Sequence, residues 1–81
     1  MFKARTADGR NNIAGIKIKE LRKALRISQR ELADRLQVIK LDVDKNAIQR
    51  IESGERFVTD IEITALAKCF GVTVNELLGI K

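Results

Sequence analysis

The sequence of 81 residues contains no proline, tryptophan, tyrosine or histidine, and its one cysteine is Cys69. A metal site of the Cys/His type and an intrachain disulfide are therefore both excluded. We expect Cys69 to be a small buried hydrophobic residue, and a lone thiol suits a cytoplasmic location. No apolar run approaches the roughly 18 residues of a membrane span, and the first residues lack the apolar stretch of a signal peptide. Because no nucleophile, base and orienting group cluster in the sequence, we expect neither an enzyme nor a cofactor or small-molecule ligand.

The length allows one domain with one core. The hydrophobic residues, mostly Ile, Leu, Ala and Val among charged side chains, favour packed helices. We predict an all-α fold of five helices over residues 12–81, preceded by a flexible basic arm, residues 1–11, which shows no periodic apolar pattern.

Positive charge is concentrated in one half of the chain. Residues 1–40 carry 11 basic and 4 acidic side chains, whereas residues 41–81 carry 5 and 7. An uneven positive field favours a polyanionic partner, because neutralising phosphates releases counterions. The net charge of +5 by itself is equally well explained by solubility.

Capping signals divide the chain into helices. The first helix is expected from Ile13, with Asn12 as its cap, to about Arg26. The other four helices are expected to begin after the capping residues Ser28, Asp44, Thr59 and Thr73. Two of them are expected to end at a glycine, Gly54 or Gly71. The side chains expected to face inward on the first and fourth helices are Ile13, Ile16, Leu21, Ala24, Leu25, Ile61, Ala65, Leu66, Ala67 and Phe70.

The segment from Gln37 to Val43 permits three interpretations: a longer second helix, a short extended piece or a packed loop. We favour a second helix that runs to about Ile39, followed by a loop.

The third helix, residues 45–52, is amphipathic. Ala47, Ile48 and Ile51 form its apolar side, and its polar side carries Lys45, Asn46, Gln49 and Arg50. Asn and Gln side chains suit adenine edges, and Arg and Lys suit guanine. An ordinary solvated face has the same composition, so the pattern alone leaves both readings open.

Three segments in the same order resemble the helix-turn-helix domains of phage repressors, Cro proteins and Xre regulators, which are similar to the DNA-binding domain of lambda repressor. They are Ser28–Ala33, Ala47–Gly54 and Ile63–Leu78, and the resemblance covers about residues 12–79. It implies a five-helix DNA-binding domain whose second and third helices form the helix-turn-helix. The distance from Leu36 to Ile48 is 12 residues where typical members have about seven, so the chain resembles a long-turn variant.

The resemblance also implies roles for individual residues. Base reading is implied for Lys45, Asn46 and Arg50, with Gln49 as a neighbour. The residues implied to contact DNA phosphate are Gln29, Ser53, Arg56 and Thr59, although Glu55 in the same loop would repel phosphate. Arg22 and Glu52 match a buried structural ion pair.

These observations predict a sequence-specific regulator of transcription, expected to be a repressor, that places the third helix in the major groove of double-stranded DNA. We expect a homodimer on DNA that uses Val74, Leu77, Leu78 and Ile80. The alternative is a protein-interaction module, such as an antitoxin or a subunit of a larger regulator, with a surface formed by Val38, Ile39, Leu41 and Val43.

Overall fold

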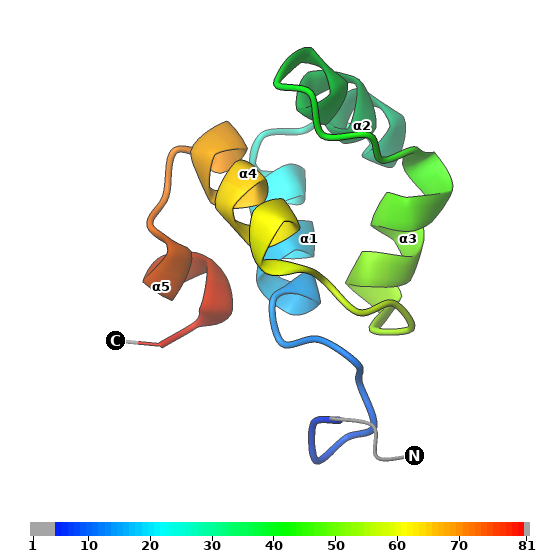
Figure 1. Cartoon of the computed structure of the whole chain (residues 1–81), viewed down its shortest axis with the longest axis vertical. Helices are drawn as coiled ribbons and strands as arrows, with labels where there is room; N and C mark the ends of the chain where they lie inside the picture. The colour runs from blue at the N-terminus through cyan, green and yellow to red at the C-terminus, as the bar shows by residue number, and fades with distance from the viewer. Residues whose placement is uncertain (1–4, 81) are drawn as a thin grey trace.

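The computed structural model describes residues 5–80, and all regular structure in that range is helical, as predicted. The five helices are α1 (Gly15–Ala24), α2 (Gln29–Val38), α3 (Lys45–Ser53), α4 (Asp60–Phe70) and α5 (Val74–Leu78). In Figure 1, α1 lies behind α4 near the centre, α2 and α3 form the upper and right-hand sides, and α5 lies on the left. None of these helices is long and apolar enough to cross a membrane.

The predicted caps set the starts of four helices. The Ser28 and Thr59 hydroxyls accept hydrogen bonds from the backbone N–H groups of Glu31 and Glu62, and both glutamates complete capping boxes. Asp44 and Thr73 cap α3 and α5 in the same position. Because each cap satisfies a backbone donor that the first helical turn leaves free, it fixes where the helix begins.

The first helix begins two residues later than predicted. The Asn12 side-chain oxygen accepts from Gly15 N at 2.7 Å, but Ala14, with helical backbone angles, occupies the N-cap position. Asn12 therefore supports the first turn from outside the helix.

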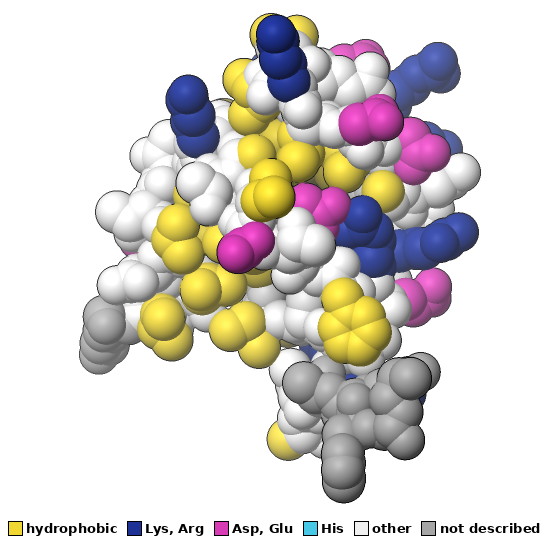
Figure 2. Space-filling view, viewed as in Figure 1, with side chains coloured by type: hydrophobic (Ala, Val, Ile, Leu, Met, Phe, Trp, Pro, Cys, Tyr) yellow, Lys and Arg dark blue, Asp and Glu magenta, His cyan; other side chains and the backbone are white. Residues whose placement is uncertain are grey.

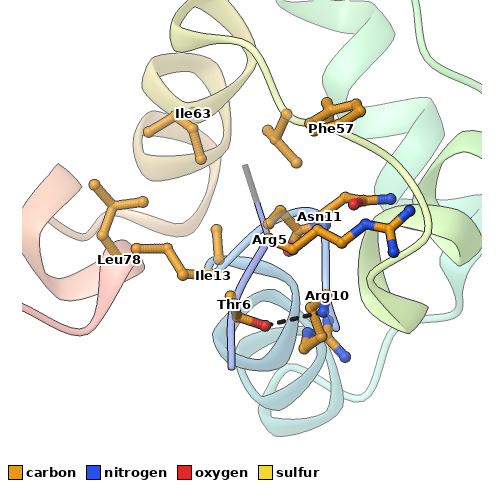
Figure 3. A pocket seen from close by; sticks show the side chains of 11 residues that line it. Arg5, Thr6, Arg10, Asn11, Ile13, Phe57, Ile63 and Leu78 are labelled. Carbon is orange, nitrogen blue, oxygen red and sulfur yellow. Dashed lines mark hydrogen bonds between the residues drawn. The ribbon is translucent and has the colours of Figure 1, made fainter. Parts of the chain in front are cut away.

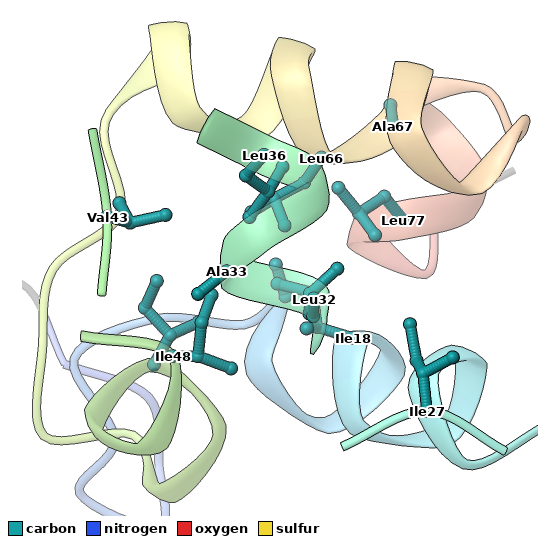
Figure 4. Close-up of a cluster of buried hydrophobic side chains, with 12 residues drawn as sticks. Ile18, Ile27, Leu32, Ala33, Leu36, Val43, Ile48, Leu66, Ala67 and Leu77 are labelled. Atoms are coloured by element: carbon teal, nitrogen blue, oxygen red, sulfur yellow. The ribbon is translucent and has the colours of Figure 1, made fainter. Parts of the chain in front are cut away.

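The core lies where all five helices meet. Figure 4 shows Leu32 and Leu36 of α2 among side chains from the other helices. The largest fully buried side chains are Ile18, Leu32, Leu36, Ile48, Ile51, Leu66 and Leu77. The core thus fixes the back of α3, which leaves its other side to solvent.

Five of the side chains predicted to face inward are exposed. Ile13, Ile16 and Leu25 are each about half exposed, Ile61 is 72% exposed, and Ala24 is exposed as well. The buried residues of α1 are Gly15 and Ile18, and Ala14 is buried just before the helix, so the predicted apolar side was placed too far round the helix. At the start of α4, Glu62 is buried instead of Ile61, because its carboxylate is held by a partner described below.

Helix α2 ends at Val38 with Ile39 as its C-cap, and a loop follows, which agrees with the favoured end at about Ile39. After α2, Leu41 N donates to Leu36 O at 2.9 Å and Lys40 N donates to Gln37 O at 2.9 Å. This pair of bonds forms a Schellman motif, with Lys40 left-handed at φ 67°. Val43 is buried, and its carbonyl accepts from Gln37 Nε2 at 3.1 Å. The additional residues are therefore anchored to α2 before α3 begins.

Lys40 occupies a backbone conformation that favours glycine. We expect Lys40→Gly to raise the free energy of unfolding by about 0.5–1 kcal/mol, because the left-handed strain of an L-residue exceeds the entropy cost of glycine. Urea denaturation measures the change. As the matched control, Lys19→Gly in the middle of α1 should lower the free energy of unfolding by about 1 kcal/mol. A Lys40→Gly variant no more stable than the original chain would contradict the role assigned to the turn.

Candidate nucleic-acid interface

Helix α3 presents a polar side to solvent over an apolar anchor. Ile48 and Ile51 are 0% and 1% exposed, and Asp44 Oδ1 accepts from Ala47 N at 2.8 Å, which fixes the first turn. The predicted base-reading residues are all exposed: Lys45, Asn46, Gln49 and Arg50. In Figure 2, Lys and Arg side chains project on the right, with Asp and Glu side chains among them, on the side where Figure 1 places α3.

A shallow hollow connects this polar side with the loop after α3. It is lined by Asn46, Gln49, Arg50, Ser53 and Glu55. The hollow therefore brings three of the predicted base-reading residues together with Ser53, which was predicted to contact phosphate. Lys45 lines a separate hollow beside Arg30 of α2. The Glu55 carboxylate places a negative charge at the edge of an otherwise favourable surface for DNA.

The Glu52 carboxylate is the meeting point of three helices. It accepts from Arg22 Nε at 2.7 Å and from Arg22 Nη2 at 3.0 Å. Gln29 Nε2 donates to the same carboxylate at 3.1 Å. Arg22 Nη1 also donates to Ile27 O at 2.9 Å. Arg22 therefore joins α1, the following turn and the end of α3, and its bond to Glu52 raises the pKa of the guanidinium.

This network gives Gln29 a contact that sequence reasoning did not predict. Gln29 is the first residue of α2 and is half-buried. One N–H of its amide group is directed to Glu52, while an amide nitrogen carries two donors. The contact with Glu52 orients the Gln29 side chain between α2 and α3.

Arg56, predicted to contact phosphate, forms a two-pronged ion pair with Glu62. Its Nη1 and Nη2 donate to Glu62 Oε1 and Oε2 at 2.9 and 2.8 Å. Thr59 N donates to Glu62 Oε1 as well, at 2.9 Å. The Arg56 guanidinium is thus held in an ion pair at the start of α4. The spacing of Arg56, Thr59 and Glu62, three residues apart, is the sequence signal that could have revealed this pair.

The ion pair between Arg56 and Glu62 makes the stability of the fold depend on pH in the acidic range. Hydrogen bonding to Arg56 lowers the pKa of Glu62 in the folded protein below its ordinary value. The ion pair therefore stabilises the fold above about pH 4.3, the ordinary pKa of a glutamate. This stabilisation is lost as the pH falls through the lower pKa of the folded protein. We expect Glu62→Gln to lose less stability than the original chain between pH 7 and about pH 3, measured by urea denaturation. Glu20→Gln, at an exposed ion pair of 3.8 Å, should behave as the original chain does. An unchanged acid response of Glu62→Gln would contradict this role.

The segment predicted to be a flexible basic arm is described only from Arg5 onward, since residues 1–4 lie outside the described residues. Thr6 to Arg10 form a hydrogen-bonded turn, and Arg10 and Asn11 bond to main-chain carbonyls at and after the end of α3. Sequence reasoning missed these contacts, because single polar residues without periodicity carry little signal. The flexibility of the arm stays a prediction.

Comparison with known proteins identifies the family. A family model described as helix-turn-helix matches residues 18–77, which include most of α1 and all of α2, α3 and α4. No curated protein sequence matches the chain. The match covers most of the chain and agrees with the five-helix fold and with the resemblance seen in the sequence. The chain belongs to the helix-turn-helix family of the Cro/C1 type, a family of DNA-binding regulators of transcription.

Proposed function

We propose that the protein is a sequence-specific repressor that inserts α3 into the major groove of double-stranded DNA. The observation that carries this proposal is the arrangement of α3: its apolar side is locked in the core, while Lys45, Asn46, Gln49 and Arg50 are exposed on the polar side. The major groove, about 12 Å wide, admits a helix presented in this way. We infer repression because a bound domain excludes other proteins from the same DNA without any further contact.

Phosphate contacts would set the register of α3 on the duplex. Gln29 lies in the first turn of α2, where free backbone N–H groups favour an anion, and Glu52 uses only one of its donors. Ser53 and Thr59 are exposed near the end of α3 and the start of α4. Arg56 would contribute its charge from within its pair with Glu62, which makes it the weakest of these predicted contacts.

A second copy of the chain would supply the other half of the binding site, about 34 Å away along the duplex. The surface available for it is a groove of about 430 Å³, lined by apolar residues and by polar ones that include Arg10 and Asn11. Figure 3 shows Ile13, Phe57, Ile63 and Leu78 around this groove. Leu77, predicted to lie in the dimer interface, is fully buried and belongs to the core instead. In Figure 2 hydrophobic side chains extend over the lower part of this face, toward α5.

Phe57, which is 50% exposed, provides the test of this surface. On a duplex with two half-sites, we expect two copies of the original chain to bind and Phe57→Ser to bind about tenfold more weakly, because the apolar contact between copies is lost. Sedimentation and titration of the duplex measure stoichiometry and affinity. Val38→Ser, at an 81% exposed position on α2, is the neutral control. Unchanged two-to-one binding by Phe57→Ser would rule out this interface.

Salt dependence tests the contact with DNA itself. The logarithm of the affinity for duplex should fall with the logarithm of salt concentration, at a slope of about −0.9 for each phosphate neutralised. Fluorescence anisotropy with a labelled duplex measures this slope. Binding that does not change with salt would contradict the proposal.

The exposure of Val38 and Ile39 favours a second candidate, a protein-interaction module such as an antitoxin. The surface is smaller than predicted, since Val43 is buried and Leu41 is half-buried. A stoichiometric protein partner that binds a domain indifferent to DNA would favour this candidate.

A further inference from the structure

Three consecutive residues before α1 bind the end of α3 and the loop that follows it. Arg10 Nη2 donates to Glu52 O at 2.8 Å. Asn11 donates to Gly54 O from its backbone, at 2.8 Å, and to Glu55 O from its side chain, at 2.9 Å. Asn12 Nδ2 donates to two carbonyls, Ile51 O at 3.0 Å and Arg56 O at 2.8 Å. We call residues 10–12 the clasp.

The surrounding chain holds the clasp in this position. Arg10 N donates to Thr6 Oγ1 at 2.9 Å, the bond drawn in Figure 3, and Thr6 N donates to Arg10 O at 2.8 Å. Two glycines provide the space: a Cβ at Gly54 would lie 2.9 Å from Arg10 Cγ, and a Cβ at Gly15 would overlap the Ile51 carbonyl oxygen. The Arg10 side chain therefore has a defined path between α1 and the end of α3.

The carbonyl groups that the clasp contacts favour a positively charged donor. The last carbonyl groups of a helix have no partner within the helix and carry partial negative charge, which favours a cation. Arg10 Nε is buried and has no hydrogen-bond partner among the described residues. A purely space-filling role would be served better by an apolar side chain, since an unpaired buried donor costs free energy. What Arg10 provides is a fixed donor at the Glu52 carbonyl.

The clasp acts on the segment that carries the proposed DNA contacts. Its acceptors belong to residues 51–56, which include the last turn of α3, with Ser53, and the loop that carries Glu55. We infer that Arg10 is a positioning residue: through the clasp it sets the position of the end of α3 and the 54–56 loop, and so contributes to selectivity among DNA sequences. This inference rests on the proposed function. A hydrogen bond weakens as its distance and angle depart from the preferred values, so a displaced donor discriminates less well between bases.

The test compares Arg10→Met with Arg35→Met, which removes the same charge from an exposed position on α2. Two quantities are measured: the ratio of affinities for a selected and an unrelated duplex, and the hydrogen exchange of the amides of Gly54, Glu55 and Arg56 without DNA. We expect Arg10→Met to lower the affinity ratio about tenfold, the effect of losing a hydrogen bond to a charged group, and to accelerate exchange. Arg35→Met should change neither. Arg10→Lys, which keeps a cationic donor, should restore part of the ratio.

The outcomes separate the clasp from the proposed function. A selective original chain whose Arg10→Met variant keeps both the ratio and the slow exchange would overturn the clasp alone. A salt slope smaller by about 0.9 in Arg10→Met would make Arg10 a phosphate contact, which also overturns it. An original chain that prefers no duplex would contradict the proposed function and the inference with it. If Arg10→Met does not fold, as judged by circular dichroism, Asn11→Ala decides in its place, because it removes one exposed bond to the same loop.

Discussion

Replacing Arg22 by methionine is expected to lower the free energy of unfolding by about 3–5 kcal/mol, because the substitution leaves the Glu52 carboxylate buried without its charge partner. The Arg22 and Glu52 side chains are 12% and 3% exposed, so water cannot replace the lost contacts. Gln29 remains as a donor but carries no charge. Urea denaturation measures the loss, and in a domain of this size 1 kcal/mol corresponds to about 4–8 °C in Tm.

Two further variants test whether the unpaired buried charge of Glu52 causes this loss of stability. Arg35→Met removes an exposed arginine and should change stability by less than about 0.5 kcal/mol. The double variant Arg22→Met, Glu52→Leu should be more stable than Arg22→Met alone, since apolar residues tolerate burial without partners. A loss below about 1 kcal/mol in Arg22→Met, or no recovery in the double variant, would contradict the structural role of the pair.

The second large effect concerns base reading. We expect Arg50→Ala and Asn46→Ala each to reduce discrimination at one base pair by about 1–3 kcal/mol, because each removes a side chain able to form paired hydrogen bonds with a base edge. Measuring affinities for a series of single-substituted duplexes assigns the base pair that each residue reads.

Ser53→Ala is the matched control for those variants. The Ser53 hydroxyl donates within its own helix, to Arg50 O at 3.1 Å, and its predicted partner on DNA is phosphate. Its loss should therefore weaken binding to all duplexes by the same factor. Equal losses at every sequence in all three variants would remove the assignment of base reading to α3.

The starts of α2 to α5 and the family could be read from the sequence because they depend on local chemistry. Ser28, Asp44 and Thr59 cap helices through bonds to residues three positions away, and such spacing is visible in a linear sequence. The polar and apolar sides of α3 follow from the helical period in the same way. Local signals therefore carried the helix-turn-helix and the candidate base-reading face.

The features that sequence reasoning missed depend on contacts between distant segments. Arg10 meets Glu52 across 42 positions, and a single arginine in a stretch without periodicity does not indicate its partner. The exposure of Ile61 shows a related difficulty: hydrophobicity favoured its burial, but the ion pair with Arg56 placed Glu62 inward instead. Competition between side chains for one buried position is decided by tertiary contacts, which outweigh the local pattern.

Selection of bound duplexes from a random pool tests the central claim most directly, that the exposed side of α3 reads a DNA sequence. For the original chain we predict a recovered palindrome whose half-sites are centred about 10 base pairs apart. The same selection with Arg50→Ala should lose the preference at one position of each half-site while keeping the others. A recovered pool without a common sequence, or the same sequence recovered equally well by Arg50→Ala, would contradict the account.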